Sequence, residues 1–227
     1  MSNLDTTSWS LIRRAAAGDA EDRERFAARY APVIRGYFST RWHLPLSHER
    51  VQDASQEVFV QCFRQGGVLA SANPELGSGF QAFLYGVARR IGANLDRRLG
   101  HLKAKEIDGH SDFDECAISS ELALSKSFDR AWASLVAREA GDLARARAEG
   151  HAARLAGLEA LQLQFFEGLQ PREIAERRGV AAEAIYESLR LAKKDFRAAF
   201  VEVMATYNPH CTEAELKQKC IDLVAHL

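Results

Sequence analysis

The stretch that decides the fold is "PREIAERRGVAAEAIYESLRLAKKDFRAAF", residues 171–200. Apolar residues recur at helical spacing on both sides of Gly179, and in the second half they include Ile185 and Leu189. Glycine tolerates the positive φ that a tight turn requires. The pattern therefore predicts a helix-turn-helix in which Val180 closes the turn. A plain helical hairpin has the same pattern, so these residues alone leave both interpretations open.

Basic residues surround this motif on the sides that would face solvent. Lys and Arg in such positions can neutralise the phosphates on either side of a DNA groove. The residues predicted to contact DNA are Arg172, Arg177, Arg178, Tyr186, Glu187, Ser188, Arg190, Lys193, Lys194 and Arg197. The other interpretation is a solvated surface whose cations form ion pairs with glutamates of the same two helices.

Composition indicates an all-α protein of one or two domains. The chain has 227 residues, of which 47% are hydrophobic and 27% charged, and only five are prolines. Ala, Leu, Arg and Glu are abundant, and no segment alternates as a strand would. The net charge of −1 argues against a protein that coats nucleic acid along its whole surface, but one basic face is enough for DNA binding.

A change of composition near residue 100 predicts two helical domains. The first covers residues 9–100, and a polar, aperiodic linker follows at 101–124. Helical periodicity returns at 125–207, which includes the helix-turn-helix, and a last short helix occupies 208–227. In that last segment Thr212 with a Glu three residues later forms a capping box.

Three further helix boundaries can be predicted from single residues. Gly18 breaks the helical block that runs from about residue 9 to 41, and Ser47 is a suitable N-cap for the next helix. Ser125 or Ser127 is the expected cap where helical periodicity resumes after the linker.

Three ordered segments resemble the extracytoplasmic-function sigma factors of bacterial RNA polymerase. "LIRRAAAGDAEDRERFAARYAPVIRGYF" (11–38) is similar to the opening of that family. "ASQEVFVQCFRQ" (54–65) and "GFQAFLYGVARRIGANLDRR" (79–98) resemble its second conserved region, and "LQLQFFEGLQPREIAERRGV" (161–180) its fourth. The resemblance covers nearly all of residues 9–205. The segment "SFDRAWASLVAREA" and the C-terminal tail look like those of a longer, planctomycete-type subgroup.

The resemblance implies a protein that binds core RNA polymerase, places it on a promoter and helps to open the duplex. Unpaired bases would stack on aromatic side chains, and arginines would hold the backbone of the strand. The residues implied in promoter melting and recognition of the −10 element are Phe80, Phe83, Tyr85, Arg89, Arg90, Arg97 and Arg98. Core packing is the alternative role of the aromatic residues, and we expect it in part for Phe83.

The resemblance also implies a surface for the polymerase core. Its residues would be Glu49, Asp53, Gln56 and Glu57. Arg50 stands where the family usually has an acid, which predicts weak or conditional core binding. Phosphorylation of Ser47 or Ser55 could restore the negative charge, although we favour Ser47 as a cap and Ser55 as an ordinary helix residue. An anti-sigma factor and a Ser/Thr kinase are therefore considered as partners.

Other functional classes have little support in the sequence. We expect no enzymatic activity, because no nucleophile, carboxylate pair or phosphate loop has suitable spacing. We expect neither cofactor nor metal, since His210, Cys211, Cys220 and His226 match no common zinc pattern. Scattered cysteines, no signal peptide and no apolar run of membrane-spanning length predict a cytoplasmic protein without membrane insertion. The alternatives that remain are a helix-turn-helix regulator acting without polymerase and a sigma-like adaptor.

Overall fold

The computed structural model describes the backbone of residues 8–75, 79–105 and 119–227, and the side chains of 9–75, 79–98 and 119–227. Within these ranges every regular element is a helix, which confirms the all-α prediction. The elements are α1 (Ser8–Ala17), α2 (Ala20–Trp42), α3 (Glu49–Phe63), the 3₁₀ helix η2 (Val68–Ser71), α4 (Gly79–Lys105), α5 (Glu121–Ala148), α6 (Ala152–Phe166), α7 (Pro171–Arg178), α8 (Ala182–Tyr207) and α9 (Glu213–Val224).

Local residue chemistry explains the first helix boundaries. Gly18 has a φ of 105° and separates α1 from α2, as predicted. The Asp19 carboxylate caps α2 by accepting a hydrogen bond of 2.9 Å from the backbone N–H of Asp22. The prediction of Ser47 as the cap of α3 is wrong. That position belongs to His48, whose ring Nδ1 accepts from the backbone N–H of Arg50 at 3.1 Å.

The predicted linker is shorter than its sequence suggested. Helix α4 continues to Lys105, and α5 begins at Glu121, so both ends of the segment 101–124 are helical. The cap of α5 is Ser120, and the prediction of Ser125 or Ser127 is wrong. The polar residues 106–118 lie outside the described residues.

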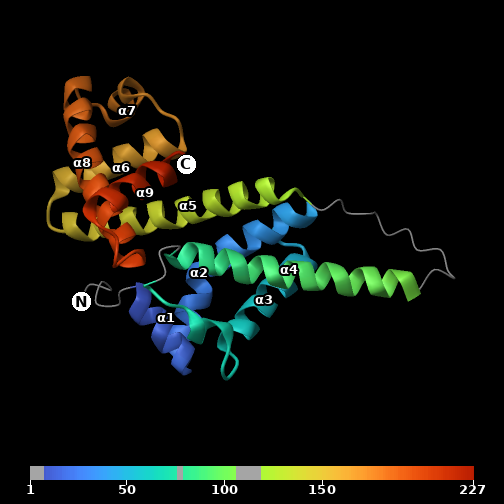
Figure 1. Ribbon diagram of the computed structural model, residues 1–227. Helices are drawn as coiled ribbons and strands as arrows, with labels where there is room; N and C mark the ends of the chain where they lie inside the picture. The colour runs from blue at the N-terminus through green and yellow to red at the C-terminus, as the bar shows by residue number, and fades with distance from the viewer. Residues whose placement is uncertain (1–7, 76–78, 106–118) are drawn as a thin grey trace.

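Helix α5 lies between the helices of the two predicted domains (Figure 1), and it packs against both α2 and α8. Trp132 of α5 stacks on Tyr30 of α2 at a centroid distance of 6.0 Å and meets Tyr207 of α8 edge-on at 4.9 Å. One hydrophobic cluster contains all three rings and continues into α1, α3, α4 and α9. The described core is thus shared across the predicted domain boundary, and the division into two domains stays a prediction.

A polar network supports the same packing. Arg29 of α2 donates two hydrogen bonds of 2.5 and 2.6 Å to Glu139 of α5. The hydroxyl of Tyr207 donates to the same carboxylate at 3.1 Å, and the indole N–H of Trp9 donates to the Tyr207 carbonyl at 3.2 Å. Burial raises the pKa of Tyr207, so its hydroxyl keeps its proton and remains a donor. These bonds attach the end of α8 to α1, α2 and α5.

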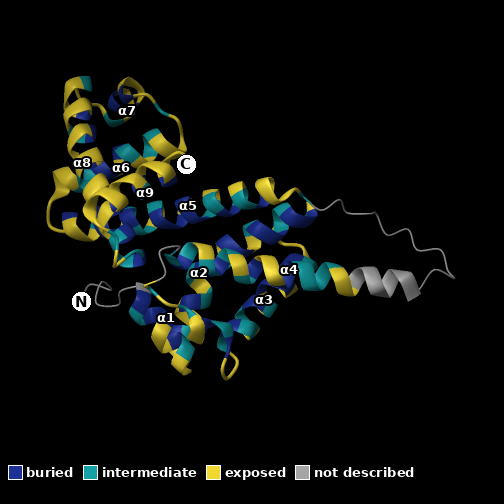
Figure 2. Ribbon diagram, in the orientation of Figure 1, coloured by how far each residue is buried: buried dark blue, intermediate teal, exposed yellow. Residues whose placement is uncertain are grey.

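The C-terminal helix begins where the sequence predicted. The Thr212 hydroxyl accepts from the backbone N–H of Glu215 at 3.4 Å, and the Glu215 carboxylate accepts from the Thr212 N–H at 2.8 Å. Leu216, Cys220 and Leu223 of α9 are buried against the protein. Val224 and Leu227 are exposed. Figure 2 shows the mixed burial of α9 beside the largely exposed outer side of α8.

Candidate nucleic-acid interface

Two helices, α7 and α8, with a turn at Gly179 occupy the stretch where a helix-turn-helix was predicted. Pro171 occupies the first turn of α7, where its missing N–H costs nothing, and the Glu173 carboxylate accepts from the Gln170 N–H at 2.6 Å. Gly179 ends the helix with a φ of 65°. Val180 was expected to close the turn, but it is 47% exposed.

A small separate core holds the motif against α6. It consists of Ala160, Ile174, Ala175, Ile185 and Leu189. Gly157 of α6 allows α8 to approach closely, because a Cβ at this position would lie 2.9 Å from the Ser188 carbonyl oxygen.

Ser188 was predicted to contact DNA, but it lies on the half-buried side of α8 near α6. Its hydroxyl donates to the Ile185 carbonyl at 3.0 Å. Ser188 therefore does not belong to the exposed surface of the motif.

The exposed side of α8 carries the cations that were predicted. Lys193, Lys194 and Arg197 are exposed, and none forms an ion pair with another residue in the described part of the chain. Tyr186 is 52% exposed and lies one helical turn before Arg190. Arg190 donates to the carboxylate of Glu187 at 2.6 and 2.8 Å, and this hydrogen bonding lowers the pKa of Glu187.

The cations around α7 are mostly paired within the protein. Arg177 pairs with Glu167 at 3.0 Å. Arg178 donates to the Ala156 carbonyl at 2.8 Å and also contacts a glutamate of α6. Arg172 is exposed and has no ion pair with the residues that the structure describes. The alternative of internal ion pairing is thus correct for part of the motif, although the partners of Arg177 and Arg178 lie outside the two helices.

The aromatic residues predicted on α4 are mainly packing residues. Phe80 is only 1% exposed, and its ring meets Trp9 edge-on at 5.7 Å. It presents no face to a base, so the prediction that it stacks on one is wrong for this arrangement. Phe83 is half-buried and stacks on Phe80 at 5.6 Å. Tyr85 meets Tyr37 edge-on at 5.8 Å and keeps its hydroxyl near the surface.

A groove of about 450 Å³ lies between α3, η2 and α4. Of the predicted residues, Phe83, Arg90 and Arg98 line it, with Glu57 on the opposite side. Arg89 and Arg97 are exposed on α4 outside this lining. The groove therefore combines apolar surface from α4 with arginines at its rim.

Sequence reasoning missed three polar residues of this groove. Gln61 and Arg64 come from the end of α3, and Asn94 comes from α4. Asn94 lies four residues after Arg90, and Arg64 three residues after Gln61, so helical spacing was the signal that could have found them.

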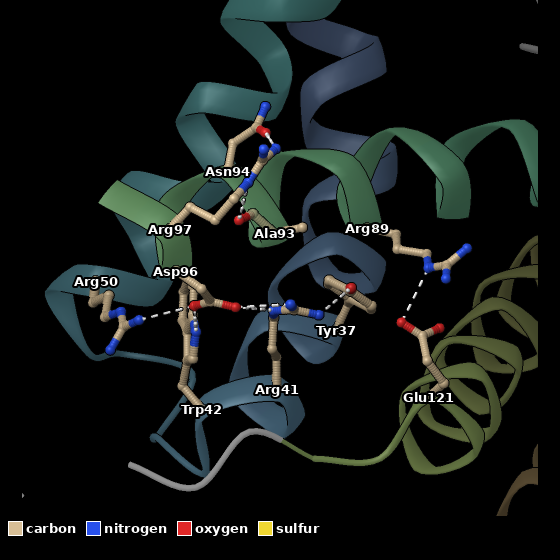
Figure 3. Close-up of polar contacts among 10 residues, drawn as sticks. All are labelled: Tyr37, Arg41, Trp42, Arg50, Arg89, Ala93, Asn94, Asp96, Arg97 and Glu121. Carbon is tan, nitrogen blue, oxygen red and sulfur yellow. Dashed lines mark hydrogen bonds and ion pairs between the residues drawn. The ribbon is translucent and has the colours of Figure 1, made fainter. Parts of the chain in front are cut away.

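Asp96 connects α4 to α2 and α3 (Figure 3). Its carboxylate accepts from Arg41 at 2.9 and 2.7 Å, from the Trp42 indole at 2.8 Å and from Arg50 at 3.3 Å. Gly92 provides the space for this network, because a Cβ there would lie 2.8 Å from the Arg41 Nε atom. The network positions the half of α4 that carries the groove residues.

Arg50 faces α4, and its side chain is 32% exposed. Its guanidinium lies 4.0 Å from the centroid of the Trp42 ring, in addition to its contact with Asp96. The predicted polymerase-binding residues Glu49, Asp53 and Gln56 are exposed. The contacts with Trp42 and Asp96 give Arg50 a packing role, and weak or conditional core binding stays a prediction.

The remaining residues of the polymerase surface and of the phosphorylation hypothesis can also be placed. Glu57 is half-buried and accepts from Gln61 at 2.8 Å. Ser55 is only 2% exposed and donates to the Val51 carbonyl at 2.7 Å. A kinase could not reach Ser55 in this fold, so that part of the hypothesis is wrong, whereas Ser47 is exposed.

The described residues contain no group of three or more His, Cys, Asp or Glu side chains that could hold a metal ion. None of the described helices combines the length and apolar character needed to cross a membrane.

Comparison with known proteins gives no independent identification. No family model matches the sequence, and no curated protein matches it. The candidate function therefore depends on the geometry above and on the sequence resemblance.

Proposed function

We propose that the chain is a sigma-type promoter-specificity factor, which recruits core RNA polymerase, recognises promoter DNA and assists duplex opening. The observation that carries the proposal is the presence of two separate basic surfaces on one chain. One is the exposed side of α8, and the other is the rim of the groove between α3 and α4.

The α8 surface suits duplex DNA. Arg197 follows Lys193 and Lys194 by one helical turn. All three are free of ion pairs among the described residues, so a phosphate needs to displace no internal carboxylate. Tyr186 adds a hydroxyl near the N-terminal end of the same helix, where a helix-turn-helix contacts base edges.

The groove suits an unpaired strand. Its volume of about 450 Å³ falls within the usual range for small-molecule sites, so the groove is large enough for a single base. Phe83 and Val87 supply apolar contacts, while Arg90 and Arg98 can neutralise the phosphates on each side of the base. Duplex opening is favoured when an extruded base and its backbone both gain such contacts.

The outer face of α3 suits a protein partner. Glu49 and Asp53 are exposed, and Gln56 follows at helical spacing. This acidic surface would meet a basic region of the polymerase core, and opposite charges would accelerate association.

Run-off transcription with purified core polymerase on genomic fragments tests the proposal. We expect transcripts from discrete start sites only when the protein is present, and we expect it to bind core polymerase in a titration. The double variant Glu49→Ala/Asp53→Ala should weaken core binding, whereas Glu213→Ala/Asp222→Ala on α9 removes the same charge elsewhere. Failure to bind core polymerase, with specific duplex binding retained, would instead indicate a helix-turn-helix regulator acting alone.

A sigma-like adaptor is a second candidate, favoured by the internal pairing of Arg177, Arg178 and Arg190. These contacts leave fewer cations for DNA than the sequence suggested. An adaptor would bind its protein partner, but it would show neither promoter-dependent transcription nor duplex binding sensitive to Lys193 and Arg197.

A further inference from the structure

Glu121, the first residue of α5, binds two α4 side chains that were predicted to contact DNA, Arg89 and Tyr85. Figure 3 shows its contact with Arg89. The Glu121 Oε1 atom pairs with the Nε atom of Arg89 at 3.0 Å. Its second oxygen, Oε2, accepts a hydrogen bond of 3.1 Å from the hydroxyl of Tyr85. Both carboxylate oxygens are therefore bound to α4.

Ser119, two residues before Glu121, is hydrogen-bonded to the end of α2, and this places the start of α5 beside α4. The Ser119 N–H donates to the Arg41 carbonyl at 3.2 Å, and the Ser119 hydroxyl donates to the Thr40 carbonyl at 2.7 Å. Ser120 then caps α5 by accepting from the Ala123 N–H at 3.3 Å. The contact of Glu121 with Arg89 and Tyr85 is thus part of a hydrogen-bonded junction between α2, α4 and α5.

A carboxylate bound in this way has the same recognition chemistry as a backbone phosphate. Both groups are anionic and offer two oxygens to an arginine and a hydroxyl donor. Burial, and then the hydrogen bond to Glu121, raise the pKa of Tyr85 to about 12, so its hydroxyl remains a donor at neutral pH.

We propose that Glu121 is an intramolecular competitor for the phosphate of a single DNA strand at Arg89 and Tyr85. This inference rests on the proposed function, in which α4 holds the unpaired strand. The side chains of Arg89 and Glu121 are 57% and 56% exposed, and exposed ion pairs are weak. A strand that is also held in the groove can therefore displace Glu121, whereas a weakly held strand cannot.

The test is the binding of a fluorescein-labelled single-stranded oligonucleotide, measured by fluorescence anisotropy at several salt concentrations. Glu121→Gln should bind roughly two- to fivefold more tightly than the unchanged protein, as expected for removal of a weak competing ion pair. The salt dependence should steepen by about 0.7 in slope, as expected for one added phosphate contact. Glu213→Gln is the matched control, because it removes the same charge from an exposed position of α9. An equal gain in both variants, or none in Glu121→Gln, overturns the proposal.

A double-mutant cycle with Arg89→Ala separates competition from a structural effect. The gain from Glu121→Gln should disappear in the Arg89→Ala background, and a gain that persists there contradicts the proposal. Thermal unfolding of each variant checks that the fold is retained.

The groove variants Arg90→Ala and Arg98→Ala distinguish this inference from the proposed function. If they weaken strand binding but Glu121→Gln behaves like Glu213→Gln, only the competitor is wrong. If strand binding is absent, or is insensitive to Arg90 and Arg98, then the strand-binding role of α4 fails and the competitor proposal fails with it.

Discussion

The Asp96 carboxylate of α4 holds the guanidinium of Arg41 of α2 through hydrogen bonds of 2.9 and 2.7 Å. The two side chains are only 15% and 8% exposed, and Trp42 and Arg50 donate to the same carboxylate. One acidic side chain thereby sets the position of α4 relative to α2 and α3. The candidate strand-binding groove depends on that position.

Loss of Asp96 should destabilise the protein strongly. We expect Asp96→Ala to lower the free energy of unfolding by about 3 kcal/mol, because it leaves the Arg41 cation poorly solvated and without its carboxylate. Asp96→Asn should cost roughly 1 to 2 kcal/mol, since its amide oxygen can still accept a hydrogen bond. Urea unfolding measures both values. The control Asp142→Ala, which breaks an exposed pair with Arg145, should stay within about 0.5 kcal/mol of the unchanged protein.

Substitution of Arg50 by an acid should destabilise the protein and give no gain in polymerase binding. Arg50→Asp removes the contact with the Trp42 ring and places a carboxylate near Asp96, so we expect a loss of roughly 1 to 2 kcal/mol. Gln52→Asp adds an acid to an exposed position of the same helix and is the control for the charge effect. In a core-binding titration, a clear increase in affinity for Arg50→Asp beyond that of Gln52→Asp would refute this structural role.

The cations of α8 should contribute unequally to duplex binding. Replacement of Lys193, Lys194 or Arg197 by Ala should each reduce the slope of log affinity against log salt by about one. Arg190→Ala should have a smaller effect, because the phosphate must compete with Glu187 for that guanidinium. Anisotropy of a labelled promoter duplex measures the slopes, with Arg130→Ala on α5 as an exposed-cation control. Equal slopes for all four α8 variants would contradict the ranking. An unchanged slope when Lys193, Lys194 and Arg197 are all replaced by Ala would indicate a purely structural helix.

Stability should fall in acid partly through Asp22. The hydrogen bond from Arg14 lowers the pKa of the Asp22 carboxyl below its ordinary value. A lowered folded-state pKa stabilises the protein above the unfolded pKa, and that contribution is lost as the pH falls through the folded pKa. Urea unfolding between about pH 5 and pH 2 should therefore show a shallower acid decline for Asp22→Asn. Glu24→Gln, on the exposed side of the same helix, is the control, and an identical decline in Asp22→Asn and the unchanged protein would argue against the linkage.

Local chemistry was sufficient where neighbouring residues decide the structure. Gly18 and Gly179 end helices as predicted, and Thr212 caps α9. Side-chain roles at Arg50 and Phe80 could not be predicted in the same way. Their partners Asp96 and Trp9 lie 46 and 71 residues away in the chain, and helical spacing does not identify partners at that distance.

The sequence by itself determined that the chain is helical, that helices end at Gly18 and Gly179 and begin at Thr212, and that cations cluster on the helix that follows Gly179. These properties follow from backbone propensity, capping and the periodicity of apolar residues, all of which act over a few residues. Only the tertiary structure decided that α5 packs on both α2 and α8, that Arg50 faces α4, and that Glu121 forms an ion pair with Arg89. The physical reason is that periodicity shows which face of a helix is buried, whereas the partner of that face depends on how all the helices pack together.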